Sequence, residues 1–348
     1  MENKKYYNNF IYDWWKNIDK VILFLFITLI ILGIFFSLVS TSLIASSKFG
    51  TNNYYFFLRH IIYISLGLIL IIFFSVIDEK KIYMIATLFF FIFFISLLLV
   101  PIFGSEIKGS RRWLDFPFLP RFQPIEFLKP FLIIFLSLII GSRFTSNNYF
   151  KFLLSALIVL PILILLVLQP DIGQTLLISS VWLSLIFVSG INLYFLNFLI
   201  FFSLSILSYL IFYIPKFSYI KFRISNFFDL SSKGNYQSQK ATDAIVDGGF
   251  FGKGIGEGIL NARVPEAHTD YVISVISEEF GILLILFILM IFLILIFKVF
   301  KKIPNEKNNS NKLILIGSIL LIIFQVLIHV GVNIRLLPTT GMTLPFLS

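Results

Sequence analysis

Long apolar stretches recur along this chain, and they constrain its fold more than any other feature. Stretches of about 18 or more apolar residues with few charges are typical of helices that cross a membrane. The sequence therefore predicts an all-α, polytopic integral membrane protein built as a bundle of about nine spanning helices. The expected spans are approximately 21–44, 57–77, 82–103, 126–141, 152–168, 172–189, 194–213, 271–297 and 313–332.

Composition supports this class and excludes others. Of the 348 residues, 58% are hydrophobic and 13% are charged, too few polar side chains for a soluble chain of this length. The absence of cysteine excludes thiolate metal sites. The first apolar stretch lacks a small-residue cleavage site, so we expect a retained span rather than a signal peptide. We expect a single membrane domain over residues 1–348 with two longer connections, 104–125 and 214–270.

Lysine positions predict the orientation. Several lysines precede the first span, and five more lie in 298–312; positive charge beside a span favours the cytoplasmic side. The N-terminus and 298–312 are therefore expected inside, and 104–125 and 214–270 are expected as outer loops, the second directly before the eighth span. Both loops are nevertheless rich in lysine and arginine. Either longer loops translocate regardless of charge, or these cations hold an anionic ligand such as a lipid phosphate.

Four polar segments are predicted on the same outer side when the chain is traced through its spans. A shared face is what an active site assembled from distant loops requires. The segments are "GSEIKGSRRWLDFPFLPRFQPIEFLKP" (104–130), "QPDIG" (169–173), "DGGFFGKGIGEG" with "RVPEAHTD" (247–270), and "LLPTTGMTLPFLS" (336–348).

The first segment carries two candidate groups for binding an anion. Arg111 and Arg112 precede Trp113; guanidinium groups bind phosphate in a bidentate manner, although simple anchoring at the membrane interface is an equal alternative. Glu126 and Lys129 are spaced i, i+3 at the start of the fourth span. That spacing favours a structural ion pair that eases burial, with substrate binding as the alternative.

The second and third segments leave further alternatives. Asp171 either caps the sixth span or serves the site. The glycines between 248 and 258 do not have the spacing of a nucleotide loop, and no strand precedes them, so no nucleotide cofactor is expected. These glycines indicate either a loop that lets backbone approach a lipid headgroup or plain loop flexibility.

Asp270 is the leading candidate for catalysis, because a general base needs an ionisable group within reach of the proton that it removes. Helix capping is the alternative. Glu266 lies one helical turn away with His268 between them, which allows a weak metal-site hypothesis for the three residues. Glu278 and Glu279 are expected about two turns deeper in the eighth span, where carboxylates are costly unless they are paired or hydrated.

These motifs, in this order, resemble the signatures of the SEDS family (shape, elongation, division and sporulation; FtsW/RodA/SpoVE). They are "RRWLDF…QPIEFLKP", "QPDIGQT", "GGFFGKGIGEG", "PEAHTDYVISVISEEFG" and "LLPTTGMTLPFLS", and they cover nearly the whole chain. "PTTGMTLPF" most resembles the FtsW branch. The resemblance also implies a tenth span after Ser348.

The resemblance implies a peptidoglycan glycosyltransferase that polymerises lipid II, a disaccharide-pentapeptide on undecaprenyl pyrophosphate, at the outer face of the bacterial cytoplasmic membrane. It assigns catalysis to Asp270. Predicted substrate contacts are Arg111, Arg112, Lys129, Glu126, Asp171, Glu266, His268 and Glu278. A divalent cation, Mg²⁺ or Mn²⁺, is a candidate helper at the leaving group, with unknown ligands.

The resemblance further implies partners and a location. The expected partners are a class B penicillin-binding protein and other divisome proteins, with no nucleic acid, at the division septum of the inner membrane. Four alternatives remain at this stage: a lipid II flippase, a non-enzymatic divisome scaffold, a RodA-type enzyme of lateral-wall elongation, and a glycan hydrolase with paired carboxylates.

Overall fold

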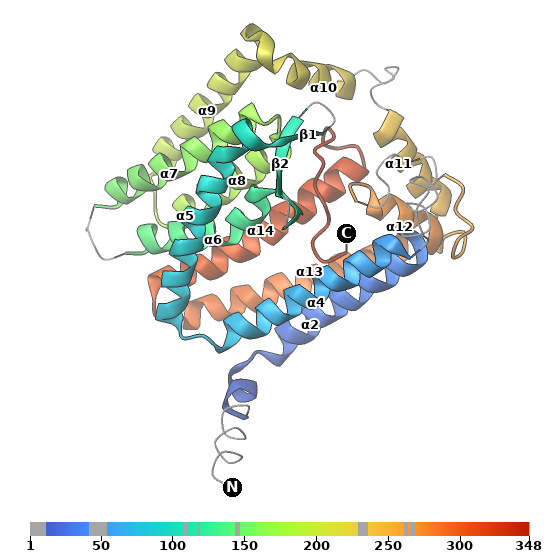
Figure 1. Ribbon diagram of the computed structural model, residues 1–348, viewed down its shortest axis with the longest axis horizontal. Helices are drawn as coiled ribbons and strands as arrows, with labels where there is room; N and C mark the ends of the chain where they lie inside the picture. Colours follow the sequence, from blue (N-terminus) through green and yellow to red (C-terminus); the bar gives the residue numbers. More distant parts are fainter. Residues whose placement is uncertain are drawn as a thin grey trace.

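The apolar stretches fold into helices, as predicted. The computed structural model describes residues 12–41, 54–107, 110–116, 119–142, 147–228, 236–260, 264 and 269–347. Its main helices are α2 (Lys20–Phe36), α4 (Tyr55–Val76), α5 (Glu79–Phe103), α6 (Pro124–Ile140), α7 (Asn148–Leu168), α8 (Ile172–Val188), α9 (Leu193–Tyr213), α10 (Ser218–Phe228), α11 (Tyr236–Gly248), α12 (Val272–Phe280), α13 (Ile282–Lys302) and α14 (Asn309–Asn333) (Figure 1).

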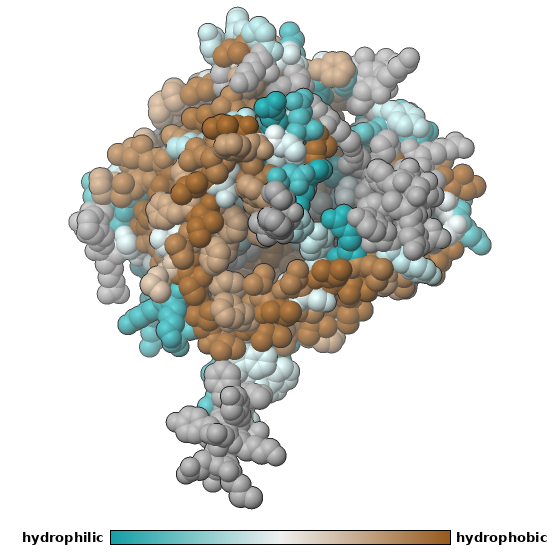
Figure 2. Space-filling view, in the orientation of Figure 1, coloured by the Kyte–Doolittle hydropathy of each residue, from teal (hydrophilic) through white to brown (hydrophobic). Residues whose placement is uncertain are grey.

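Within the described ranges, seven helical segments are long and apolar enough to cross a membrane, and α8 is a shorter apolar helix. Helix α6 and helix α8 each contain 17 residues, a length of about 26 Å against a hydrocarbon core of about 30 Å. The chain is thus a multi-pass helical membrane protein, while the count of nine spans stays a prediction. Figure 2 shows hydrophobic side chains covering the visible sides of the long helices.

Phenylalanines join α5 to α6 in the larger core. The ring centroids of Phe90 and Phe135 lie 4.3 Å apart, and those of Phe93 and Phe127 lie 5.2 Å apart, both pairs stacked. Phe89 of α5 and Phe131 of α6 stack in the same way, with ring centroids 5.2 Å apart. A regular aromatic stripe thus holds the two helices side by side. Helices α7, α8, α9 and α14 complete this core.

The eighth span is not one helix, which corrects the prediction of a continuous span over 271–297. The chain breaks at Gly281, whose φ of 82° is the left-handed conformation that glycine adopts readily. A Cβ at this position would lie 2.2 Å from the carbonyl oxygen of Phe250. Helix α12 is therefore a separate buried helix, and α13 is the spanning one. Glu278 and Glu279 belong to α12 and do not lie within a spanning helix.

The connection over 104–125 contains a small antiparallel sheet in the order β1-β2-β3, from β1 (Ser105–Ile107), β2 (Ser110–Phe116) and β3 (Leu119–Phe122). An ion pair between Arg121 and Asp115, 2.7 Å apart, ties β3 to β2. The connection over 214–270 contains α10 and α11. Helices α7 and α8 form the predicted tight hairpin, because α7 ends at Leu168 and α8 begins at Ile172.

The N-terminal end of α2 and the C-terminal end of α13 lie together, as the lysine pattern predicts. Asp19 caps α2 by accepting from the backbone N–H of Val21 at 2.9 Å, and its carboxylate lies 2.6 Å from Lys302 Nζ. The hydrogen bond from Lys302 lowers the pKa of Asp19. The turn before α14 joins the same end, since Asn308 Nδ2 donates to Glu79 Oε1 at 3.2 Å. We call this the lysine end; in Figure 1 it lies away from α10, α11 and α12.

Candidate functional site

The opposite end of the bundle gathers residues from all four predicted segments, and we call it the motif end. Helix α8 begins so close to the C-terminal segment that a Cβ on Gly173 would lie 2.9 Å from Thr340 Cβ. A Cβ on Gly341 would lie 3.7 Å from Asp270 Oδ2. Arg112 Nη1 of β2 lies 3.7 Å from Asp171 Oδ2 at the start of α8. Segments far apart in sequence thus meet at one place.

Asp171 confirms the capping hypothesis, whereas its role in the site stays a prediction. It caps α8, because its Oδ1 accepts from the backbone N–H of Gln174 at 3.4 Å. Its Oδ2 accepts from Gln123 Nε2 at 2.9 Å and faces Arg112. Burial raises the pKa of this carboxyl group, and the positive charge of Arg112 partly opposes that rise.

Arg111 and Arg112 separate, because successive side chains on a strand point to opposite faces. Arg112 turns inward, and its Nε donates to the carbonyl oxygen of Gln169 at 3.0 Å. It also donates to the carbonyl oxygen of Pro170. Arg111 is exposed and pairs with Glu106 on β1 at 3.5 Å. Arg112 therefore ties the sheet to the α7–α8 hairpin, whereas substrate binding by Arg111 stays a prediction.

The predicted pair on α6 forms. Lys129 Nζ lies 2.7 Å from Glu126 Oε2, and the side chains are 4% and 41% exposed respectively. Gln174 of α8 also donates to Glu126. Within the described part of the chain, Lys129 Nζ has no hydrogen-bond partner of good geometry. A buried ammonium with spare N–H donors is suited to bind an anion.

Asp270 lies just before α12, between α14 and the C-terminal segment. Asn333 Nδ2 donates to its carbonyl oxygen at 3.1 Å. Burial raises the pKa of the neighbouring Tyr271 hydroxyl; the negative charge of Asp270 adds to that rise, and the positive charge of Arg223 opposes it. Arg223 of α10 also donates to the carbonyl oxygen of Thr339 at 3.3 Å. A carboxylate and a guanidinium group thus share this neighbourhood.

Helix α14 holds the C-terminal segment in place. His329 Nδ1 lies 2.7 Å from the carbonyl oxygen of Met342, and Gln325 Nε2 donates to that of Thr343 at 3.1 Å. Within the part of the chain that the structure describes, several buried polar atoms at this end have no hydrogen-bond partner. They belong to Gln169, Gln174, Tyr271, His329, Asn333, Arg335 and Thr340.

Glu278, another predicted site residue, lies away from Asp270. Glu278 is buried at the far end of α12, where its Oε1 accepts from the backbone N–H of Leu260 at 2.8 Å. That end is about 13 Å from Asp270 along the helix. Glu266 and His268 lie outside the described residues. Among the described residues, no group of three or more His, Asp or Glu is arranged to hold a metal ion, so the divalent cation stays a prediction.

Sequence reasoning did not single out Gln123, Gln174, Arg223 and Asn333. Gln123 and Gln174 stand inside the quoted motifs "QPIEFLKP" and "QPDIGQT", and this was a usable signal. Asn333 follows the last apolar stretch with no motif around it, and Arg223 is one of many basic residues in a long connection. Only the tertiary fold brings Asn333 to Asp270 and Arg223 to the neighbouring Tyr271.

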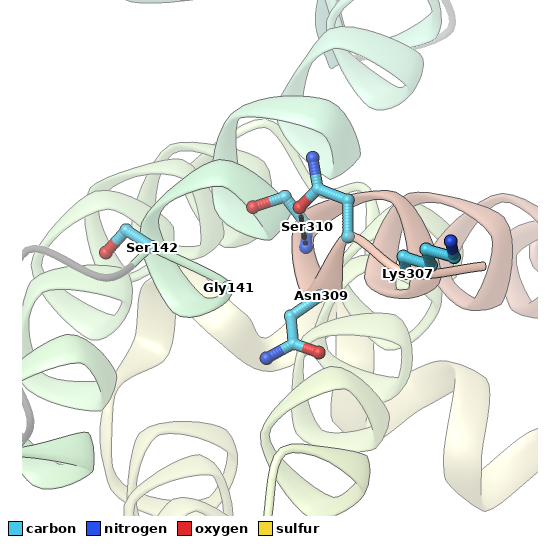
Figure 3. Close-up of a pocket in the computed structure, with 6 residues that line it drawn as sticks. Gly141, Ser142, Lys307, Asn309 and Ser310 are labelled. Carbon is cyan, nitrogen blue, oxygen red and sulfur yellow. Dashed lines mark hydrogen bonds between the residues drawn. The ribbon is translucent and has the colours of Figure 1, made fainter.

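A polar groove of about 430 Å³ lies at the lysine end, between the end of α6 and the start of α14. It is lined by Gly141, Ser142, Lys307, Asn308, Asn309 and Ser310. Figure 3 shows the side chains of Ser142, Asn309 and Lys307 pointing in different directions. They do not converge on a common point, so we do not place the chemistry here.

Comparison with known proteins agrees with the motif pattern. Residues 19–348 match the FtsW/RodA/SpoVE family model, described as a cell cycle protein. A protein of Nitrosomonas europaea named "Probable peptidoglycan glycosyltransferase FtsW" is 32% identical over 344 residues, which cover 95% of this chain and 87% of its own. Its namesake from Hydrogenovibrio crunogenus is 31% identical over 329 residues, which cover 92% of this chain and 83% of its own.

Solved structures share the fold. A chain from a peptidoglycan synthase complex, described as coordinating polymerization and crosslinking, superposes with a TM-score of 0.75 at 25% identity, over 95% of this chain and 92% of that one. The rod shape determining protein RodA of Thermus thermophilus superposes with a TM-score of 0.67 at 25% identity, over 96% of this chain and 91% of that one.

Proposed function

The chain belongs to the FtsW/RodA/SpoVE family of cell cycle proteins, and we infer that it is a peptidoglycan glycosyltransferase, the activity in the names of its curated relatives. We propose that it polymerises lipid II at the outer face of the cytoplasmic membrane, for septal wall synthesis. The observation that carries this proposal is the meeting of Asp270, the start of α8 and the C-terminal segment at one end of the bundle.

The proposed reaction joins two sugar units. The 4-hydroxyl oxygen of the acceptor GlcNAc bonds to C1 of the terminal MurNAc on the growing strand, and the bond from C1 to the pyrophosphate oxygen breaks. The Asp270 carboxylate takes the hydroxyl proton, and undecaprenyl pyrophosphate leaves with the bonding electron pair. General-base catalysis of this kind contributes typically about 10²- to 10⁴-fold to a rate.

The leaving pyrophosphate needs cations near the motif end. Lys129 is the first candidate, because its ammonium is buried and has donors to spare. Arg112 is a second, although much of its guanidinium group already binds the α7–α8 hairpin. The donor set among the described residues does not form a metal site, so no step is assigned to a metal ion; adding Mg²⁺ or Mn²⁺ back after chelation tests that separate prediction.

Orientation supports an outer location. The lysine end holds Asp19, Lys302 and Lys307, and the positive-inside rule favours the cytoplasm for it. The motif end then faces outward, where lipid II is used. We also propose a class B penicillin-binding protein as partner, because a structural neighbour comes from a complex that coordinates polymerization with crosslinking. Co-purification with the cognate transpeptidase tests this partner.

Asp270→Ala and Asp270→Asn in proteoliposomes with labelled lipid II test the function. We expect wild type to form glycan strands and both variants to lose about 10²-fold or more of that rate. Asp78→Asn, the same change at an 80% exposed side chain of the lysine end, is the matched control and should be unaffected.

The products of this assay also separate the alternatives. Glycan strands formed at the wild-type rate by Asp270→Ala would remove Asp270 from the mechanism. Translocated but unpolymerised lipid II would indicate a flippase, cleaved glycan a hydrolase, and unchanged lipid II a scaffold.

A further inference from the structure

The glycine-rich segment after α11 is a fixed turn packed on the end of α12. A Cβ on Gly248 would lie 2.0 Å from the carbonyl oxygen of Ser277, and one on Gly252 would lie 2.2 Å from that of Glu279. The backbone N–H of Lys253 donates to the carbonyl oxygen of Glu278 at 2.8 Å. The backbone of the turn therefore packs against the backbone of α12. The N–H groups of the turn bond to carbonyl groups at the end of α12 that have no partner within the helix. This contact accounts for the glycines without a ligand.

The same turn is bonded to the first residues of a spanning helix. Gly249 accepts from the backbone N–H of Ile282 at 3.0 Å, and Phe250 accepts from that of Leu283 at 3.4 Å. Ile282 begins α13, which is long and apolar enough to cross a membrane. The turn therefore lies at the level where α13 enters the bilayer.

Large apolar side chains point outward from this turn. Phe250 is 70% exposed and Phe251 is 82% exposed, and Ile255 and Ile259 are exposed as well. On α13, whose first residues bond to Gly249 and Phe250, Leu283, Leu286 and Phe287 are exposed as well. An apolar patch of this kind on a protein surface marks a contact with a partner or a membrane.

We propose that the turn from Gly249 to Ile259 is a membrane-contacting element, with the rings of Phe250 and Phe251 inserted among the lipids beside the outer end of α13. The occupant is bilayer lipid, because the patch continues the surface of a spanning helix that lipid already covers. The glycine backbone of the turn packs against α12, and the aromatic side chains of the turn point away from it. Together these features fix the depth of the turn in the membrane. An effect of this membrane contact on the distance between Asp270 and the bilayer surface rests on the proposed function. The membrane contact itself does not.

A spin label tests the contact without using activity. The chain contains no cysteine, so Phe251→Cys supplies a single labelling site, in proteoliposomes of phosphatidylethanolamine and phosphatidylglycerol. Collision of the label with oxygen, which concentrates in lipid, is compared with collision with a water-soluble nickel complex. Leu286→Cys on the exposed side of α13 is the lipid control, and Asp78→Cys in the turn before α5 is the water control.

We expect the oxygen-to-nickel accessibility ratio at Phe251→Cys to match that at Leu286→Cys and to exceed that at Asp78→Cys. A ratio equal to that of Asp78→Cys would place the turn in water and overturn the proposal. Low accessibility to both reagents would mean coverage by protein and would overturn it too. Ile259→Cys repeats the measurement at a second position, and a monodisperse elution profile shows that each variant is folded.

Discussion

Helix α14 runs from the lysine end to the motif end, and the polar side chains at these two ends differ in burial and in hydrogen bonding. At the lysine end, Asn308 caps the helix by accepting from the backbone N–H of Ser310 at 3.0 Å, and Lys307 is exposed to solvent. At the motif end, His329 and Asn333 are buried, and each keeps a side-chain atom without a hydrogen-bond partner in the described part of the chain.

The two ends are expected to contribute differently to the free energy of folding. A buried polar atom left without a partner costs about 1–3 kcal/mol, so the buried polar atoms at the motif end are the ones that a bound ligand could stabilise most. The lysine end has polar groups that satisfy one another or water, and this arrangement serves stability. Under the proposed function, polar groups at the motif end bind the substrate. Comparable substitutions at the two ends test this difference.

The largest effect after Asp270 is expected from Lys129→Met. Losing one charged hydrogen bond to pyrophosphate, worth about 1.5–3 kcal/mol, should slow lipid II polymerisation about 10- to 100-fold. Lys307→Met makes the same change at the lysine end and should leave the polymerisation rate unaltered. Folding should survive, because Glu126 is 41% exposed and water can solvate its charge.

A double variant separates binding from structure at this pair. If the pair only supports the fold, Glu126→Gln combined with Lys129→Met should restore both the melting temperature and the polymerisation rate. Our account expects a restored melting temperature with the polymerisation rate still low. Recovery of the rate would contradict it.

A smaller effect is expected from Arg112→Lys. Lysine cannot reproduce the fork that reaches Gln169, Pro170 and Asp171 together, so the free energy of unfolding should fall by about 1–3 kcal/mol. Arg121→Lys changes an arginine of the same sheet that is 48% exposed, and it should cost less than about 1 kcal/mol. Denaturation in detergent measures both, and equal losses would mean that Arg112 does not hold the hairpin.

The smallest effect is expected from Gly173→Ala. Its new methyl group would meet Thr340 Cβ and Met342 Cγ, each at 2.9 Å; because the methionine can move, we expect a loss of about 1 kcal/mol. Gly67→Ala on α4 meets nothing within 4 Å and should be neutral or slightly stabilising. Melting temperatures of the two variants give the comparison, and a stabilised Gly173→Ala would show that the packing there is loose.

Much of the fold could be predicted from the sequence because a spanning helix depends on a local property, its apolar length. The predicted spans and the observed helices agree to within a few residues at most ends. The ion pair of Glu126 with Lys129 and the cap by Asp171 were also predictable, because both depend on spacing along one helix.

The features that were missed depend on tertiary contacts. The sequence predicts one span through Gly281 because apolar residues stand on both sides of Glu278 and Glu279. The backbone of Phe250 packed against Gly281 shows why the helix breaks there. The small sheet was missed because its strands are short and stand in a polar connection. Arg223 approaches Tyr271 and Asn333 contacts Asp270 only once α10 and α14 are packed.

Single cysteines in this cysteine-free chain test directly whether the motif end faces the outside of the cell. Arg121→Cys marks the sheet at the motif end, and Lys307→Cys marks the lysine end. In intact bacteria treated with a membrane-impermeant maleimide, we predict labelling of Arg121→Cys, whereas Lys307→Cys should react only after lysis. Labelling of Lys307→Cys in intact cells while Arg121→Cys stays protected would contradict the account.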